Sequence, residues 1–291
     1  MKASGILLVD KPQGLTSHDV VARTRKAAGT RKVGHAGTLD PMATGLLVLG
    51  INSSTRLLTY LVGLDKEYFA TIRLGVSTDS DDADGSVVST SSTREVTYAQ
   101  IEAGVAKLRG PISQVPSTVS AIKVDGKRAY ALAREGEEVV LKPRPVTIST
   151  FEVIDRRGDD VDVRVECSSG TYVRALARDL GADLGVGAHL TALRRTRIGP
   201  FAVDGAHAME GLDVAAALIG PAEAASALFD RVELSDQQAL ELTQGKRFDV
   251  EAPDGSPVAA VTASGRLVGL VTIASGRVRT LVNFPTDEVA E

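Results

Sequence analysis

The stretch Gly34–Gly45 reads Gly-His-Ala-Gly-Thr-Leu-Asp-Pro-Met-Ala-Thr-Gly and constrains the backbone more than any other part of the chain. Three glycines and a proline within this stretch favour a tightly turned loop, because glycine tolerates positive φ and proline fixes φ. The loop carries an imidazole, hydroxyls and the carboxylate of Asp40. By itself an Asp-Pro pair is more typical of an ordinary turn than of a catalytic site, so the loop alone does not establish a function.

The length and composition predict a large buried core. A chain of 291 residues with 43% hydrophobic residues is long enough for one large domain and a smaller companion. The apolar run at residues 6–9 is too short for a signal peptide, and no stretch approaches the roughly 20 apolar residues of a membrane helix. The one cysteine excludes an internal disulfide and fits a reducing compartment. We therefore expect a soluble, cytoplasmic protein.

The charge distribution is uneven. A net charge of −4 argues mildly against a nucleic-acid partner, because phosphate binding needs local positive potential. Basic residues nevertheless form three clusters: Arg23, Arg25, Lys26, Arg31 and Lys32; Lys123, Lys127 and Arg128; and Arg194, Arg195 and Arg197. One such cluster is most often a solvated helix face. Three clusters that bracket the other motifs make RNA contact more plausible.

Hydrophobic periodicity predicts the elements of the first half of the chain. Short apolar runs predict strands at residues 6–9, 46–51 and 68–74. Helices are predicted at 17–28, with Ser17 as the cap, and at 97–108. A polar loop is predicted at 77–93, with a turn at Asp84-Gly85.

The second half of the chain has three regions with different sequence patterns. Residues 111–145 are irregular, with a short helix predicted at 128–134, and we expect an insertion that grips a partner. Alternation predicts a strand at 161–167 with Cys167 facing the core. The next helix starts near Arg174, where a cation opposes the helix dipole and therefore suggests a specific anionic partner. Helix or connector is predicted at 211–227, followed by three strands between 258 and 284.

The Gly34–Gly45 loop closely resembles the G-H-x-G-x-L-D-P-x-A-T-G motif of the TruB family, the bacterial tRNA pseudouridine-55 synthases. Further segments resemble family motifs in the same order and extend the match over roughly residues 5–200: Asp10–Ser17, Lys66–Tyr68, Arg73–Gly75, Asp82–Gly85 and Cys167–Arg174.

The resemblance implies an α/β (α+β) fold. A pseudouridine synthase catalytic domain, with a mixed β-sheet flanked by helices, is expected at residues 1–228 and holds an RNA-gripping insertion at 111–145. A small β-rich, PUA-like RNA-binding domain is expected at 229–291, although the match there is weak.

The resemblance also implies an isomerase. Its substrate is the uridine at position 55 in the T loop of tRNA, whose N1–C1′ bond is broken before C5 is joined to C1′. This chemistry needs a carboxylate, a pocket for the detached base and extraction of the nucleotide from its stack, which costs a few kcal/mol. It needs neither a metal nor a redox cofactor. We expect a monomer whose partner is the T arm of tRNA, and the reaction intermediate is left open.

Roles for individual residues follow from the family motifs. Asp40 is implied to be catalytic, and Arg174 is implied to lie beside it, where a guanidinium lowers the pKa of a carboxyl group. Tyr68 is implied to stack on the target base, a contact worth about 1–3 kcal/mol. His35 is implied to assist nucleotide flipping. The remaining implied site residues are Lys11 and Pro12, which support the floor of the site, and Asp82, Tyr172 and Leu193, which lie near the flipped uridine.

Two other functions stay open on the residues alone. An RNA-binding protein or tRNA-folding chaperone would use the same basic clusters, without needing Asp40. A glycosidase would need two carboxylates flanking the scissile bond, for which Asp40 and Asp82 are the candidates. A nucleotide-binding loop is excluded, because Gly34–Gly45 has neither the Gly-x-x-x-x-Gly-Lys-Ser/Thr nor the Gly-x-Gly-x-x-Gly spacing.

Overall fold

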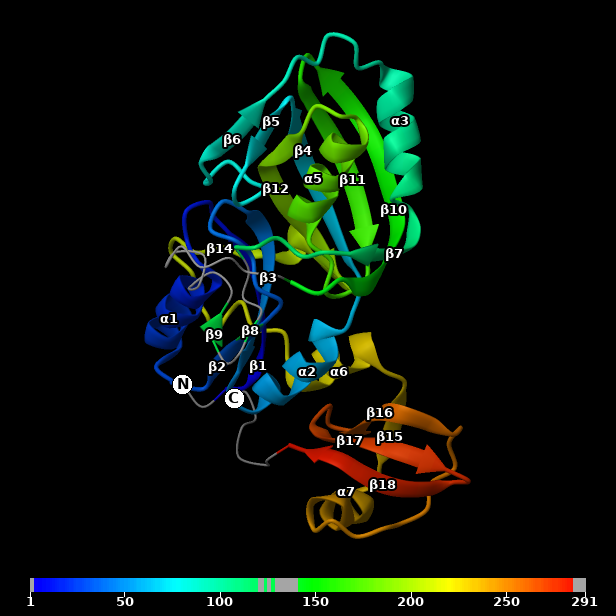
Figure 1. The fold of residues 1–291 in the computed structure, drawn as a ribbon. Coiled ribbons are helices and arrows are strands. Elements are labelled where there is room, and N and C mark those ends of the chain that lie inside the picture. The colour runs from blue at the N-terminus through cyan, green and yellow to red at the C-terminus, as the bar shows by residue number, and fades with distance from the viewer. Residues whose placement is uncertain (1–2, 120–122, 125–126, 129–140, 285–291) are drawn as a thin grey trace. The chain divides into compact units, whose positions relative to one another are not determined.

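The computed structural model describes residues 3–119, 123–124, 127–128 and 141–284 (Figure 1). These residues divide into two compact units. Unit 1 comprises residues 3–41, 45–62 and 199–284, and unit 2 comprises the described residues of 42–44 and 63–198. The predicted domain boundary at 228/229 stays a prediction.

Unit 1 contains a mixed sheet built around its first strand. β1 (Gly5–Lys11) pairs antiparallel with β3 (Thr44–Ile51) and parallel with β14 (His207–Ala208). β2 (Val33–Ala36) pairs antiparallel with β3. The strands predicted at residues 6–9 and 46–51 are confirmed. Their buried side chains pack with those of the first helix in one core, which includes Leu7, Val9, Val20, Val21, Leu47 and Leu49.

The first helix, α1 (Ser17–Ala28), has the predicted length but a different cap. Thr16 has an extended backbone, and its hydroxyl oxygen accepts a hydrogen bond from the backbone N–H of Asp19. The Asp19 carboxylate in turn accepts from the backbone N–H of Thr16, which completes a capping box. The prediction of Ser17 as the cap is therefore wrong. Ser17 is instead buried, and its hydroxyl both accepts from the backbone N–H of Leu39 and donates to the Leu39 carbonyl.

Unit 2 contains an antiparallel sheet with two helices over one face (Figure 1). Its strand order is β12 (Ala188–Ile198), β4 (Lys66–Leu74), β11 (Asp160–Cys167), β10 (Arg144–Arg157) and β7 (Gly110–Gln114). The helices are α3 (Tyr98–Lys107) and α5 (Val173–Asp183). The strands predicted at 68–74 and 161–167, and the helices predicted at 97–108 and from near Arg174, are confirmed. Cys167 is buried as predicted, and burial raises the pKa of its thiol to about 11.

Two regions of unit 2 differ from expectation. The predicted loop at 77–93 contains a hairpin of β5 (Val76–Thr78) and β6 (Val87–Thr90); the side chains of β6 are all exposed, and neither short strand shows a hydrophobic alternation in the sequence. The irregular 111–145 region contributes β7 and a short pair, β8 (Lys123–Val124) with β9 (Lys127–Arg128). Arg128 lies in a strand, and the rest of the predicted 128–134 helix lies outside the described residues.

The C-terminal part of unit 1 forms a separate four-stranded sheet. β15 (Arg231–Leu234) runs parallel to β16 (Gly255–Thr262), and β17 (Leu267–Ala274) and β18 (Arg277–Asn283) continue the sheet antiparallel. The three predicted strands are confirmed, whereas β15 and α7 (Asp236–Thr243) were not predicted. The shorter elements of unit 1 are η1 (Asn52–Leu57), α2 (Leu58–Val62), β13 (Phe201–Ala202), η2 (Val203–Gly205) and α6 (Pro221–Leu228). Among the described residues, no helix is both long enough and apolar enough to cross a membrane.

The last residue of β1 is a buried lysine. Lys11 is 0% exposed, and its ammonium donates to the backbone carbonyls of Pro12 at 2.9 Å, Leu15 at 2.7 Å and Pro41 at 3.3 Å. The backbone N–H of Gly14 donates to the same Pro41 carbonyl at 2.8 Å. A buried ammonium is tolerated where its donors are satisfied, and here they bind the chain after β1 to the loop that contains Asp40.

We predict that Lys11→Met lowers the free energy of unfolding by about 2–4 kcal/mol, because methionine fills similar space but leaves the buried carbonyls without their donor. Urea denaturation measures the difference. Lys32→Met is the control, because Lys32 is exposed. Equal stability of Lys11→Met and the wild type would show that the ammonium does not hold this loop.

Candidate functional site

The loop that carries Asp40 is fixed on both sides of the aspartate. Gly37 and Gly45 have φ of 84° and 97°, which β-carbon-bearing residues rarely adopt. The residue before Asp40 is held at its N–H and carbonyl by the Ser17 hydroxyl, and the residue after it is held at its carbonyl by Lys11 and Gly14. Asp40 itself is half-buried. These contacts present its carboxylate from a rigid backbone.

His35 and Pro12 lie in the same unit as Asp40. His35 is half-buried on β2 opposite Leu49, and its ring lies edge-on to that of His18, with centroids 5.7 Å apart. Pro12 contributes one of the carbonyls that hold the Lys11 ammonium. Lys11 is thus engaged with backbone carbonyls, as a structural residue would be.

Unit 2 contains a buried ion pair. The Nη1 atom of Arg174 lies 3.2 Å from Oδ2 of Asp82, and their side chains are only 3% and 6% exposed. Sequence reasoning expected a specific anionic partner for Arg174, and the structure places Asp82 in contact with it. Whether Asp40 is a further partner stays a prediction. Removing one member of a buried pair is typically costly, because the other charge is left uncompensated.

Backbone groups complete the surroundings of this pair. Arg174 donates to the carbonyls of Ser80 and Val119, each at 2.7 Å. The Asp82 carboxylate accepts from the Ser80 hydroxyl and from the backbone N–H of Asp84, the latter at 3.1 Å. The guanidinium therefore ties the loop 78–84 to the segment 115–119.

Tyr68 and Leu193 project from one face of the unit 2 sheet. Tyr68 pairs with Arg195 across β4 and β12, and Ala70 pairs with Leu193 two residues further along, so the side chains share a face. Tyr68 is 8% and Leu193 7% exposed. Tyr172 precedes α5, and its backbone N–H and carbonyl are both bonded to the side chain of Gln114.

The residues predicted for the site fall into two groups. Asp40, Lys11, Pro12 and His35 belong to unit 1, and Tyr68, Asp82, Tyr172, Arg174 and Leu193 belong to unit 2. Within the second group the structure brings Arg174 and Asp82 into contact. That all nine residues form one site stays a prediction.

Sequence reasoning missed a buried cation beside Tyr68. Lys66 is 6% exposed, and its ammonium donates to the Leu64 carbonyl. It lies opposite Cys167 on β11 and Ile198 on β12. Burial, and then the positive charge of Arg195, lower the pKa of Lys66 to about 8. The signal in the sequence is faint, because a lysine at the start of a strand is usually exposed.

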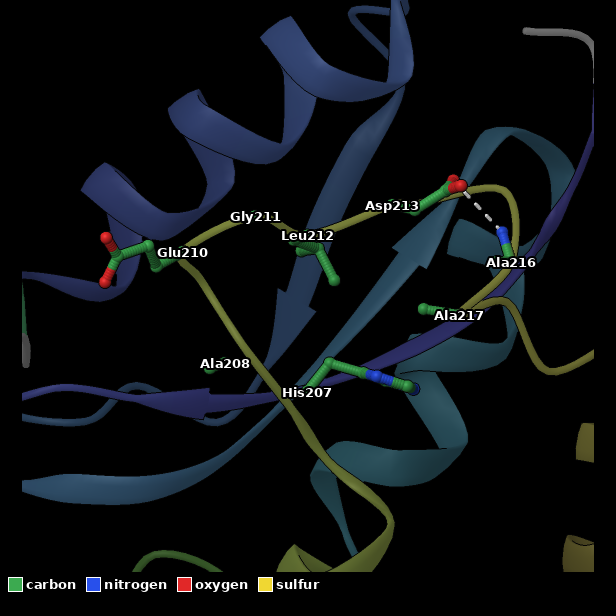
Figure 2. A pocket seen from close by; sticks show the side chains of 8 residues that line it. All are labelled: His207, Ala208, Glu210, Gly211, Leu212, Asp213, Ala216 and Ala217. Atoms are coloured by element: carbon green, nitrogen blue, oxygen red, sulfur yellow. Dashed lines mark hydrogen bonds between the residues drawn. The ribbon is translucent and has the colours of Figure 1, made fainter.

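One cavity in unit 1 does not bring its polar side chains together around a common point. It has a volume of about 240 Å³ and is lined by His207, Ala208, Glu210, Gly211, Leu212, Asp213, Ala216 and Ala217. Figure 2 shows Glu210 and His207 pointing in different directions, while Asp213 accepts hydrogen bonds from the backbone N–H groups of Ala215 and Ala216. The described residues contain no group of three or more His, Cys, Asp or Glu side chains arranged to hold a metal.

We predict that the stability of the wild type rises relative to Lys66→Met as the pH increases from about 7.5 to about 10. The folded-state pKa of Lys66 lies below its unfolded value, so the unfolded chain binds more protons in this window and folding becomes more favourable as the pH rises. The expected change in the difference is on the order of 2 kcal/mol, measured by urea denaturation. Lys107→Met, at a 65% exposed side chain, is the control and should show no such trend. A constant difference for Lys66→Met would mean that Lys66 is not desolvated.

Comparisons with known proteins match the whole chain. Residues 25–173 match the N-terminal domain of the TruB family pseudouridylate synthases. Residues 174–236 match the tRNA pseudouridylate synthase B C-terminal domain, and residues 229–285 match tRNA pseudouridine synthase II, C terminal.

Individual proteins that are similar to this chain support the same family. The tRNA pseudouridine synthase B of Leifsonia xyli subsp. xyli (strain CTCB07) is 59% identical over 300 residues, which cover 100% of this chain and 99% of the relative. That of Streptomyces coelicolor is 50% identical over 291 residues, covering 96% and 97%. Among solved structures, an H/ACA RNP bound to a substrate RNA containing 2′-deoxyuridine matches with a TM-score of 0.74 and 25% identity, over 98% of this chain and 86% of that one. The chain, with its mixed sheet, flanking helices and Asp40 loop, belongs to the TruB family of pseudouridylate synthases.

Proposed function

We propose that Asp40 is the catalytic carboxylate of this TruB-family enzyme. The enzyme is a tRNA pseudouridine synthase, an isomerase that makes pseudouridine at position 55 in the T loop of tRNA. The observation that carries the role of Asp40 is its loop: Ser17 fixes the preceding residue, and Lys11 and Gly14 fix the following one. Such preorganisation is what a catalytic group requires, because misplacement by about 1 Å costs large factors in rate.

The proposed reaction rearranges one nucleotide. The N1–C1′ bond breaks, the uracil turns, and C5 forms a bond to C1′ while its hydrogen leaves as a proton and N1 gains one. Asp40 is required for the bond cleavage, and the target uridine is flipped out of its stack to reach the carboxylate. Atoms balance without an added reactant.

The proposal also gives roles to residues of unit 2. Arg174 is placed beside Asp40 in the proposed complex, where its positive charge keeps the carboxylate ionised. Asp82 compensates the buried guanidinium within unit 2. Tyr68 stacks on the target uracil, while Tyr172 and Leu193 line the space for the flipped nucleotide.

The remaining assignments concern the RNA. His35 assists flipping, Lys11 and Pro12 support the floor of the site, and residues 229–291 form a PUA-like domain that adds RNA contacts. The basic side chains of the 111–145 insertion grip the T arm. The proposed enzyme acts as a monomer in the cytoplasm.

We predict that Asp40→Asn abolishes isomerisation while RNA binding survives, because asparagine keeps the shape but not the charge. Tritium release from T-arm RNA labelled with [5-³H]uridine measures turnover, since formation of the C5–C1′ bond expels the C5 hydrogen. A filter-binding assay measures the affinity for the same RNA.

Asp204→Asn is the matched control, because Asp204 is exposed on the short helix η2 of the same unit. It should release tritium at the wild-type rate. Full activity of Asp40→Asn would remove Asp40 from the chemistry. Loss of both binding and turnover would instead indicate a folding or RNA-gripping role.

We predict that Tyr68→Phe slows single-turnover tritium release without weakening RNA binding, because phenylalanine retains the stacking face but lacks the hydroxyl. Tyr98→Phe is the control, since Tyr98 is 50% exposed and its hydroxyl donates to Glu102 on the surface. An unchanged rate in Tyr68→Phe would exclude the hydroxyl from the mechanism.

A further inference from the structure

A second arginine on α5 lies one turn after Arg174. Residues four apart on a helix share a face, so Arg174 and Arg178 extend toward the same surroundings. The Nη1 atom of Arg178 lies 3.2 Å from Oδ2 of Asp81, the residue directly before Asp82. Its Nη2 donates to the Val115 carbonyl at 2.7 Å. The helix thus binds two consecutive aspartates with two arginines.

The two arginines bridge the same pair of segments. Arg174 contacts Ser80 and Asp82 in the loop 78–84 and Val119 in the segment 115–119. Arg178 makes the corresponding contacts with Asp81 in the loop and Val115 in the segment. The position of the loop 78–84 relative to the segment 115–119 is therefore set by their shared contacts with α5 rather than by either segment alone.

Asp81 is held in an unusual conformation. Its φ is 62°, in the left-handed region, and its backbone carbonyl accepts from Leu190 on β12 at 3.0 Å. The side chain is 12% exposed. Burial raises the pKa of its carboxyl group above the usual value, although a hydrogen bond with Ser117 and the charges of Arg178 and Arg174 oppose the shift. The Asp81 carboxyl group therefore interacts electrostatically with both guanidinium groups.

The arrangement creates a competition for Arg174. With Arg178 present, each aspartate has its own arginine at 3.2 Å. Without Arg178, the buried Asp81 carboxylate has Arg174 as its remaining cation on α5, and attraction to it pulls that guanidinium away from Asp82. Asp179 beside Arg178 is also acidic, so Arg178 offsets local negative charge from two sides.

We propose that Arg178 is a positioning residue for the reaction: by neutralising Asp81 and holding Val115, it keeps the Arg174 guanidinium on Asp82. The inference rests on the proposed function and adds to it a residue that acts through Arg174.

The test is single-turnover tritium release from T-arm RNA by the full chain, with RNA affinity and melting temperature measured for each variant. Arg178→Gln should slow release about tenfold with RNA affinity changed less than about twofold, because a small displacement of the active-site cation affects rate more than binding. Arg178→Lys should recover part of the rate, because lysine restores the positive charge but lacks the planar set of donors of a guanidinium group.

The decisive variant is the double substitution Arg178→Gln with Asp81→Asn. Asparagine tolerates the left-handed backbone and removes the competing charge, so the double variant should regain most of the wild-type rate. Asp81→Asn alone should stay close to the wild type. Lys107→Gln is the matched control, because Lys107 pairs with Asp183 on the last turn of the same helix at 2.8 Å. It should keep the wild-type rate.

The outcomes separate this inference from the function on which it rests. No tritium release by the wild type overturns the proposed function and this role with it. Release by the wild type with an unchanged rate in Arg178→Gln overturns the positioning role alone. A slow Arg178→Gln that Asp81→Asn fails to rescue overturns the competition for Arg174 and leaves a packing role.

Discussion

The ammonium of Lys11 is the contact on which the Asp40 loop depends. A buried cation at the end of β1 is stabilised by the carbonyls of Pro12, Leu15 and Pro41, and one of these belongs to the residue after Asp40. The hydroxyl of Ser17 does the same for the residue before Asp40. The aspartate therefore lies on a stretch of backbone that contacts from β1 and α1 hold in place, as a catalytic group requires.

Unit 2 also contains a buried cation, the guanidinium of Arg174. A guanidinium buried to 3% exposure is costly unless its charge is compensated; Asp82 compensates the charge of Arg174, and the carbonyls of Ser80 and Val119 accept hydrogen bonds from its two Nη atoms. The second pair, Arg178 with Asp81, lies one helical turn away and repeats the pattern. Both guanidiniums are thus held by contacts within the protein, as electrostatic preorganisation requires.

Much of the fold could be predicted because its elements are strongly periodic. The strand at 161–167 alternates strictly, and the helix after it has a regular apolar face, so both were found. The cap of α1 was misassigned because Thr16 and Ser17 are chemically similar, and only the backbone shows which one caps. The β5–β6 hairpin was missed because both strands are short and β6 is exposed throughout, so neither shows a hydrophobic alternation.

The candidate site was predictable as a set of residues but not as a set of contacts. Asp82 and Arg174 were both named from family motifs, yet no local pattern connects residues that are so distant in the chain. Arg178 and Asp81, 97 residues apart, escaped notice for the same reason, since each alone is an ordinary surface charge by sequence. Lys66 became visible only when its burial between β11 and β12 was known.

The central claim is that this chain isomerises one uridine in the T loop. The most direct measurement is single-turnover treatment of an unmodified tRNA transcript with the purified protein, followed by chemical mapping of pseudouridine at nucleotide resolution. Pseudouridine is expected at position 55 and at no other uridine. Pseudouridine elsewhere, or none despite tight tRNA binding, would contradict it.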